Sequence, residues 1–251
     1  MTTIDELSAQ ITHFLSAVLP MRLQDSTPML SWYGHDDSSR EVVEYNGSVI
    51  IVRSSDRLLG ITAWHVIQGY REARAISSDL VCKLGGLVID PSERILGESE
   101  HADLATFAIE DSELAAIGYV PLEEAWPPNV PANKGLVLLG GWPGKERQIV
   151  GGITKGGFST VWGHAGVSNF QFTVILDHDA KPFSPIPGVP LPPSGFDFGG
   201  ASGGPVMTVD LADDGKSLTM RLGGIIKQGN PDYDVVVAAR ADMINADGSI
   251  R

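Results

Sequence analysis

The stretch 200–205, Gly-Ala-Ser-Gly-Gly-Pro, is the most informative part of the sequence for both fold and chemistry. It places one serine, Ser202, in a glycine-rich turn. Glycines beside a serine let backbone N–H groups come close to a developing negative charge, which larger side chains would prevent. A serine hydroxyl is nevertheless a poor nucleophile and needs a neighbouring base to take its proton as it attacks. A reactive serine at this position therefore implies a base elsewhere in the chain.

Two earlier stretches supply the other groups. Residues 61–66, Ile-Thr-Ala-Trp-His-Val, lead into His65, and residues 103–108, Asp-Leu-Ala-Thr-Phe-Ala, form an apolar strand that opens on Asp103. An imidazole titrates near neutral pH and suits the role of the base. A carboxylate on its other nitrogen fixes the tautomer and stabilises the imidazolium that forms. The three stretches together predict a catalytic triad of His65, Asp103 and Ser202.

The order of these residues decides between two kinds of hydrolase. The pattern Gly-x-Ser-x-Gly also occurs in α/β-hydrolases, whose triad runs serine, acid, histidine along the chain. The last histidine here is His178, so none follows Ser202. Each motif alone has a plainer explanation, namely a histidine in a core or an aspartate in a turn. The coincidence of all three in the order His65, Asp103, Ser202 favours the catalytic interpretation.

These motifs resemble those of the chymotrypsin-like (trypsin-like) serine peptidases, especially the bacterial branch without disulfides. The resemblance rests on residues 62–66, 103–105 and 200–205, and it extends from about Ser48 to Ala239. It implies a serine endopeptidase that cleaves peptide bonds through an acyl-enzyme intermediate. We expect neither a cofactor nor a metal.

The resemblance also implies an all-β fold of two six-stranded antiparallel β-barrels with the site in the cleft between them. His65 and Asp103 would come from the first barrel and Ser202 from the second. The N–H groups of Gly200 and Ser202 would form the oxyanion hole. The expected organisation is an N-terminal amphipathic helix in residues 1–24, followed by barrels over 25–120 and 121–251.

The same resemblance places a substrate pocket around Phe196, Lys227, Gln228 and Gly229. A phenylalanine on the floor would leave a shallow, apolar pocket. Lys227 stands where the strand that lines the substrate cleft usually carries a small hydroxyl residue. Two explanations are open: Lys227 pairs with Asp103, or the alignment of this strand is off by one residue.

A further departure concerns activation. Ala201 occupies the position at which animal-type members carry an aspartate that binds a freshly cut N-terminus. Activation by that route is therefore not expected. A second hypothesis keeps the same fold without the reaction: a catalytically weak or inactive module that binds a peptide or protein partner.

The local patterns agree with a β-rich chain. Turn residues separate ten short β-like runs, at 48–52, 58–62, 81–89, 104–109, 135–139, 149–153, 170–176, 205–209, 218–226 and 234–239. Helix is expected in the capped, amphipathic segment that starts at Thr3 and stops at Pro20, at Ser112–Ile117, and at Ala241–Ala246. From the residues alone, the class is an all-β barrel or sandwich.

Composition limits the partners. The 251 residues carry 18 basic and 31 acidic side chains, a formal net charge of −13, which repels nucleic acid and anionic membranes. No apolar stretch reaches the roughly 20 residues that span a bilayer. The N-terminus has Asp5 and Glu6 where a secretory signal would be basic, and Cys82 is the single cysteine. We therefore expect a cytoplasmic protein, and the resemblance to peptidases implies that it acts on a peptide or protein substrate.

Two weaker patterns have plainer explanations, and a third segment suggests regulation. His101 and Asp103 alternate like metal ligands, but no third ligand is spaced to match, and residues 177–179, Asp-His-Asp, are typical of a solvated loop rather than a calcium site. The segment 181–199 contains six prolines between residues 182 and 193 and leads into the serine turn. Because it cannot join a strand ladder, few hydrogen bonds hold it, and we expect it to sample conformations in which the Gly200 N–H points away from the oxyanion site. A regulatory protein partner or the substrate would shift it to the competent form.

Overall fold

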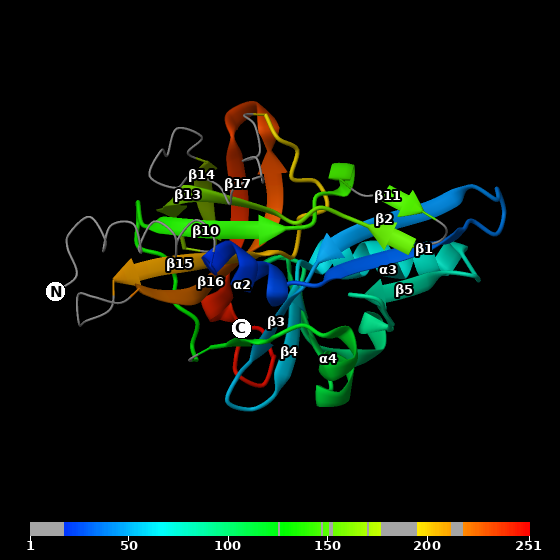
Figure 1. Cartoon of the computed structure of the whole chain (residues 1–251), viewed down its shortest axis with the longest axis horizontal. Coiled ribbons are helices and arrows are strands. Elements are labelled where there is room, and N and C mark those ends of the chain that lie inside the picture. The colour runs from blue at the N-terminus through cyan, green and yellow to red at the C-terminus, as the bar shows by residue number, and fades with distance from the viewer. Residues whose placement is uncertain are drawn as a thin grey trace.

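The structure is a computed structural model that describes residues 18–124, 126–146, 148–150, 153–169, 171–176, 195–211 and 218–251. It is mostly β, with a closed six-stranded barrel in the second half and two open sheets in the first (Figure 1). Nearly all of the predicted N-terminal helix and residues 181–194 of the proline-rich segment lie outside the described residues. The predicted stop at Pro20 is wrong, because Pro20 stands in the first turn of helix α2 (Leu19–Asp25), where its missing N–H leaves no bond unmade.

The barrel of the second half confirms half of the expected architecture. Every neighbouring pair in it is antiparallel. In order around the barrel the strands are β10 (Leu136–Gly141), β13 (Ser159–Val167), β14 (Gln171–Leu176), β17 (Val235–Arg240), β16 (Leu218–Asn230) and β15 (Pro205–Leu211). Strand β14 shows why the sequence folds this way, since Phe172 and Val174 alternate inward with half-buried or exposed residues between them.

The first half is built differently from the expected six-stranded barrel. One sheet contains β2 (Val42–Ser48), β1 (Met29–His35), β5 (Val81–Leu84) and β6 (Leu87–Val88). The other contains β7 (Ile95–Ser99), β8 (Leu104–Ala108), β4 (Leu58–Thr62), β3 (Ile50–Arg53) and β9 (Leu122–Glu123). Strand β3 follows β2 directly, and the N–H groups of Val49 and Ile51 donate to the Pro28 and Ser26 carbonyls at 3.1 Å and 2.9 Å, in the register of the β1–β2 pair. A second closed barrel is thus not confirmed, and β3 and β9 are parallel.

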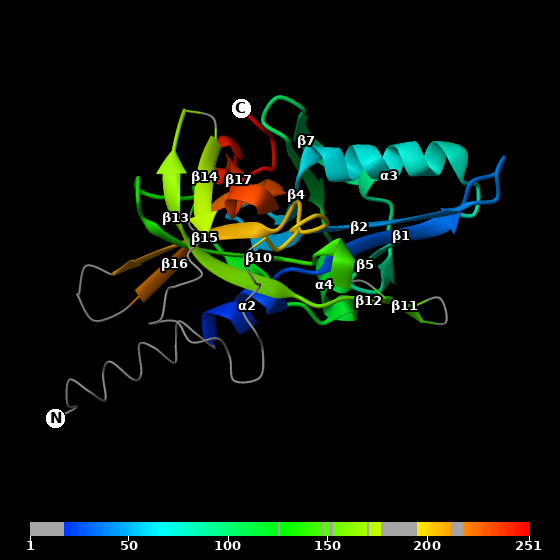
Figure 2. The ribbon, with the colours of Figure 1, turned by 90° about the horizontal axis from the view of Figure 1, so that it is seen from above.

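The largest element that the sequence analysis missed is helix α3 (Trp64–Ile76). Figures 1 and 2 both show it alongside the β1–β2 hairpin. Gly69 in its middle lowers the helical propensity of the segment, and Val66 and Ile67 are β-branched. Their burial, together with that of Tyr70 and Ala73, nevertheless follows one helical face. This packing stabilises the helix where propensity does not.

The other helical segments agree better. Helix α4 (Asp111–Ile117) matches the predicted helix, and Glu110 and Glu113 form a capping box at its start. At the C-terminal end, where a helix over 241–246 was expected, only the 3₁₀ turn η5 (Ala241–Met243) is found. The remaining described elements are the strands β11 (Gln148–Val150) and β12 (Ile153–Lys155) and the 3₁₀ turns η2 (Pro91–Arg94), η3 (Gly144–Glu146) and η4 (Pro231–Tyr233).

The two halves share one apolar core. Side chains on one face of β3, β4 and β8, including Ile50, Ile61 and Leu104, pack with Leu138 and Ile225 of the barrel. The opposite face of the same sheet packs against α3 in a separate cluster. Because both faces of this sheet are covered, its strands read as continuous apolar runs in the sequence. The predicted domain boundaries at residues 24 and 120 remain predictions.

Phe107 offers a test of this packing. It is fully buried in β8, the strand that follows Asp103, and its ring fills the space above Gly60. We expect Phe107→Ala to lower the free energy of unfolding by about 3–5 kcal/mol in urea denaturation, because a cavity remains in the core. Tyr233→Ala, at a residue that is 75% exposed, serves as the control and should change it by less than about 0.5 kcal/mol.

Candidate active site

The start of a helix and two separate turns bring the predicted triad residues together. His65 is the second residue of α3, Asp103 lies in the turn directly before β8, and Ser202 lies in the turn directly before β15. All three line one cavity of about 300 Å³. Its other lining residues are Asp197, Phe198, Gly199, Lys227, Gln228 and Gly229. The sequence predicted this meeting of distant segments.

His65 and Asp103 are held together by two kinds of hydrogen bond. The Nδ1 atom of His65 lies 2.9 Å and 3.0 Å from the two carboxylate oxygens of Asp103. The backbone N–H of His65 also donates to Asp103 Oδ1 at 3.0 Å. The Asp103 side chain is 14% exposed and the His65 side chain 45% exposed. A carboxylate on Nδ1 keeps the ring proton there and leaves Nε2 as the basic nitrogen facing the cavity.

The carboxylate of Asp103 remains ionised in spite of its burial. Burial alone would raise its pKa, but the hydrogen bonds and the charge of His65, with a contribution from the Lys227 ammonium, hold the pKa below its usual value. The backbone around Asp103 is unusual too, with a φ of 54° in the left-handed region. Such a backbone conformation is uncommon for a residue other than glycine. At Asp103, whose side chain is bonded to His65, it indicates that the surrounding structure holds the backbone in place.

Ser202 is oriented differently from the expected nucleophile. Its hydroxyl donates to the backbone carbonyl of Lys227 at 3.0 Å. Lys227 is the extra residue of a β-bulge in β16, between Ile226 and Gln228, so its carbonyl is not used in the ladder. Within the described residues, the structure gives no hydrogen bond between Ser202 and His65.

The backbone of the serine turn presents two free donors. Within the described residues, the N–H groups of Gly200 and Ser202 donate no hydrogen bond, whereas those of Ala201, Gly203 and Gly204 do. The free pair is the one predicted for the oxyanion hole. Two N–H groups two residues apart in one turn are able to stabilise a negatively charged oxygen between them.

Two glycines in this turn are needed for its shape. Gly200 has a φ of 91° and Gly203 a φ of 86°, which other residues rarely adopt. A Cβ atom at Gly203 would come within 2.1 Å of both the Ser48 carbonyl oxygen and the Thr62 hydroxyl. Strand β2 and the end of β4 therefore press directly on the serine turn.

Strand β2 also holds the turn through hydrogen bonds that the sequence analysis missed. Ser48 N–H donates to the Ser202 carbonyl at 2.8 Å, and Thr62 Oγ1 donates to the Ser48 carbonyl at 2.8 Å. Asn46 Nδ2 donates to the Trp142 carbonyl at 2.7 Å and lies 3.4 Å from the Gly200 carbonyl. These residues position the turn and carry no motif of their own. Only the polar spacing of Asn46 and Ser48 in a strand could have drawn attention to them.

The residues predicted for the substrate pocket are only partly brought together. Lys227, Gln228 and Gly229 line the cavity, but Phe196 does not, and Phe198 takes its place. The two phenylalanine rings pack edge to face, 4.8 Å apart, and both belong to the barrel core, although only Phe198 also borders the cavity. The expected register is thus two residues off, because buried and exposed side chains alternate along 196–198 with Asp197 between the rings.

Lys227 does not form the expected ion pair with Asp103. Its Nζ atom lies 3.4 Å from Gln171 Oε1 of β14, and its charge acts on Asp103 only from a distance. The backbone carbonyl of Lys227, rather than its ammonium group, is what contacts the triad. The bulge that exposes this carbonyl is the physical reason.

The remaining candidates of the sequence give no second site. Among the described residues, no group of three or more His, Cys, Asp and Glu side chains is placed to hold a metal ion. Residues 177–179 lie outside the described residues. Cys82 is buried, and burial raises the pKa of its thiol. In the described part of the chain, no helix combines the length and apolar character that crossing a membrane requires.

Comparison with known proteins gives a low-identity structural similarity. No protein-family model matches the sequence, and no curated protein matches it. Among solved structures, the chain is similar to the crystal structure of the Rv3671c protease from M. tuberculosis in its active form. The alignment has 14% sequence identity and a TM-score of 0.49, and covers 91% of this chain and 82% of that one.

The lowered pKa of Asp103 predicts how acid affects stability. A carboxylate whose pKa is lower in the folded state stabilises the fold above its unfolded pKa of about 3.9, and this stabilisation is lost as the pH falls through the folded value. We expect Asp103→Asn to lower the free energy of unfolding by about 1–3 kcal/mol at pH 6. The difference from the wild type should shrink as the pH falls below about 4. Denaturation at several pH values measures it.

Asp111→Asn is the matched control. Asp111 also pairs with a cation, Arg53, but its side chain is 79% exposed. A solvent-exposed pair of this kind contributes less than about 1 kcal/mol. An equal, pH-independent loss in both variants would contradict the prediction for Asp103.

Proposed function

We propose that the chain is a serine endopeptidase of the chymotrypsin-like type, with His65, Asp103 and Ser202 as its triad. The single observation that carries the proposal is the doubly hydrogen-bonded His65–Asp103 pair in the same cavity as Ser202. The free N–H groups of Gly200 and Ser202 add the second requirement of acyl transfer. The resemblance of the three sequence motifs to that family supports the proposal independently of the structure.

The proposed reaction follows from these positions. Ser202 Oγ leaves the Lys227 carbonyl, gives its proton to His65 Nε2 and attacks the substrate carbonyl carbon. The resulting oxyanion accepts from the N–H groups of Gly200 and Ser202, while Asp103 stabilises the imidazolium. His65 then protonates the departing amine as the C–N bond breaks, which leaves an ester on Ser202. Water, deprotonated by His65, cleaves the ester, and its proton restores the Ser202 hydroxyl.

The orientation of Ser202 supports one alternative. A hydroxyl that donates to the Lys227 carbonyl is what a non-reacting module, one that binds a peptide or partner without cutting it, would also have. The two functions differ in whether Ser202 becomes acylated. Covalent labelling by a fluorophosphonate probe therefore separates them directly, since the probe reacts with an activated serine.

The triad prediction is that Ser202→Ala or His65→Ala lowers turnover of a peptide ester by about 10⁴–10⁶-fold. Without the nucleophile or its base, only the oxyanion donors and substrate binding remain. The free energy of unfolding should change little in Ser202→Ala, since Ser202 is not a core residue, whereas His65→Ala also removes the imidazole bonds to Asp103 and should lower it about as much as Asp103→Asn does. Retention of more than a tenth of the wild-type rate by Ser202→Ala would show that another group attacks.

The specificity prediction concerns the residue before the cut. Phe198 and Gly229 form an apolar wall of the cavity, which Lys227 and Asp197 also line. We expect small or medium apolar residues to be preferred there over Arg and Lys, which would lose hydration against this wall. Cleavage of a peptide library measures the preference. Dominant cleavage after Arg that disappears in Asp197→Asn would instead assign the cavity to basic residues.

A further inference from the structure

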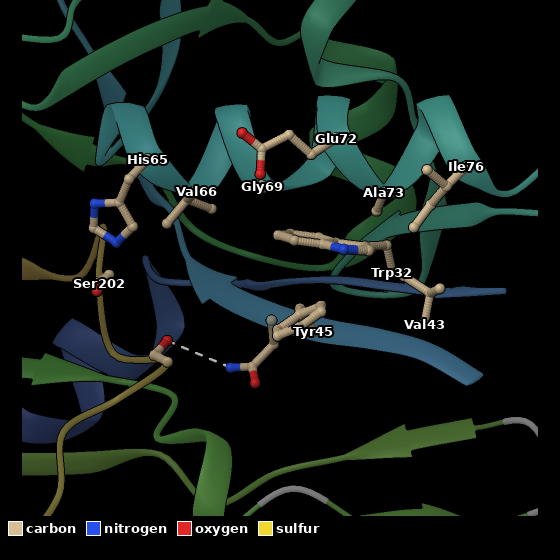
Figure 3. A pocket seen from close by; sticks show the side chains of 12 residues that line it. Trp32, Val43, Tyr45, His65, Val66, Gly69, Glu72, Ala73, Ile76 and Ser202 are labelled. Atoms are coloured by element: carbon tan, nitrogen blue, oxygen red, sulfur yellow. Dashed lines mark hydrogen bonds between the residues drawn. The ribbon is translucent and has the colours of Figure 1, made fainter. Parts of the chain in front are cut away.

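A second cavity opens on the other side of Ser202. It has a volume of about 600 Å³ and lies between α3 and the β1–β2 hairpin. Figure 3 shows His65 and Ser202 at one end, with Trp32, Tyr45 and Ile76 further along it. The two cavities have only His65 and Ser202 in common among their lining residues. A peptide that crosses Ser202 can therefore occupy both.

The walls of this second cavity suit an apolar side chain. Trp32 and Val43 line it from the hairpin, and Tyr45 and Ile76 stand at its rim although they are 61% and 47% exposed. Exposed apolar side chains gathered at a hollow, next to a candidate active site, are typical of a binding surface. The size of the cavity exceeds what one side chain fills, which favours a segment of about two residues.

A side chain that lines the cavity, Trp32, carries a buried hydrogen-bond donor for which the described residues offer no partner. Trp32 is 4% exposed, and its indole Nε1 is buried with no acceptor among the described residues. Buried donors are nearly always paired in native structures, so an unpaired one points to a partner that is still to bind. The carbonyl oxygens of a peptide backbone are acceptors of the required kind.

We propose that this cavity binds the leaving-group side of the substrate. One of the two residues after the cut would place a large apolar or aromatic side chain against Trp32, and a substrate carbonyl would accept from Trp32 Nε1. The assignment rests on the proposed peptidase function, in which the cavity beside Phe198 and Gly229 takes the residue before the cut. The second cavity is then left for the residues that follow it.

Acyl transfer isolates this side of the site. An amine added to the acyl-enzyme attacks the ester carbon, forms a new amide bond, breaks the bond to Ser202 Oγ and returns a proton to that oxygen through His65. The acyl group is the same for every amine, so competition between amines reports only the leaving-group side. We expect phenylalanine amide or glycyl-phenylalanine amide to capture the acyl-enzyme at least tenfold better than glycine amide.

Gly69 offers a position from which the cavity can be filled. It lines the cavity from α3, and a Cβ atom there would meet only the Trp32 ring, at an ordinary contact distance of 3.7 Å. Gly69→Leu should abolish the preference for the phenylalanine-containing amine. Ala75→Leu, an exposed position on the same helix, is the matched control and should keep it. Thermal unfolding of both variants verifies that they fold.

A second readout does not depend on catalysis. In Ser202→Ala, the NMR signal of the Trp32 indole N–H, assigned by its loss in Trp32→Phe, should shift when glycyl-phenylalanine amide is added. Fluorophosphonate labelling with equal capture of all amines and an unmoved indole signal would overturn this inference while the peptidase function stands. An indole shift without labelling would leave an apolar peptide site and overturn the peptidase function instead. Neither labelling nor a shift would overturn both.

Discussion

The contact between the serine turn and strand β2 is the constraint on which the site depends. A Cβ at Gly203 would lie 2.1 Å from the Ser48 carbonyl oxygen, so the two backbones meet with no space between them. The Ser48 N–H then donates to the Ser202 carbonyl, and the opposite side of the turn is fixed by hydrogen bonds to β16 around Ile226. Because the turn is clamped between the first half and the barrel, the free N–H groups of Gly200 and Ser202 have a defined direction.

This clamp also explains why the two cavities lie where they do. The serine turn divides the space between the halves, with the bulge of β16 on one side and the β1–β2 hairpin on the other. Helix α3 completes the second side, and its first turn carries His65. The helix that orients the imidazole therefore also forms a wall of the larger cavity. The candidate base and the wall of the larger cavity thus belong to the same helix.

Part of this arrangement could be predicted from the sequence. The three motifs placed His65, Asp103 and Ser202 together because the chemistry requires each of those groups and the chain order is restrictive. Periodicity found most strands of the barrel, where inward and outward residues alternate. It missed α3, since Gly69 and the β-branched residues argue locally against a helix that tertiary packing stabilises. Burial on one face of the segment is the property that decided its structure.

Other features depend on contacts between residues far apart in the sequence. Asn46 and Ser48 form hydrogen bonds with Trp142, which is more than 90 residues away in the sequence. No local pattern in the sequence marks these contacts. Whether Phe196 or Phe198 faces the cavity depends on a shift of two residues within a loop, which spacing from Ser202 cannot fix. The division of the first half into two open sheets likewise depends on which strands pair across the chain, as where β3 pairs with both β4 and the distant β9.

The free energy needed to reorient the Ser202 hydroxyl is small compared with the barrier that an enzyme lowers. Leaving the Lys227 carbonyl gives up one neutral hydrogen bond, which contributes about 0.5–1.5 kcal/mol net, and the new bond to His65 compensates for much of that. The rotation itself moves the side chain between staggered rotamers. The whole cost corresponds to at most about a tenfold change in rate, whereas enzymes lower barriers by about 8–23 kcal/mol. The bond to Lys227 is therefore compatible with a reactive serine, and the difference between a peptidase and a binding module must lie in how well the oxyanion donors and the His65–Asp103 pair stabilise the transition state.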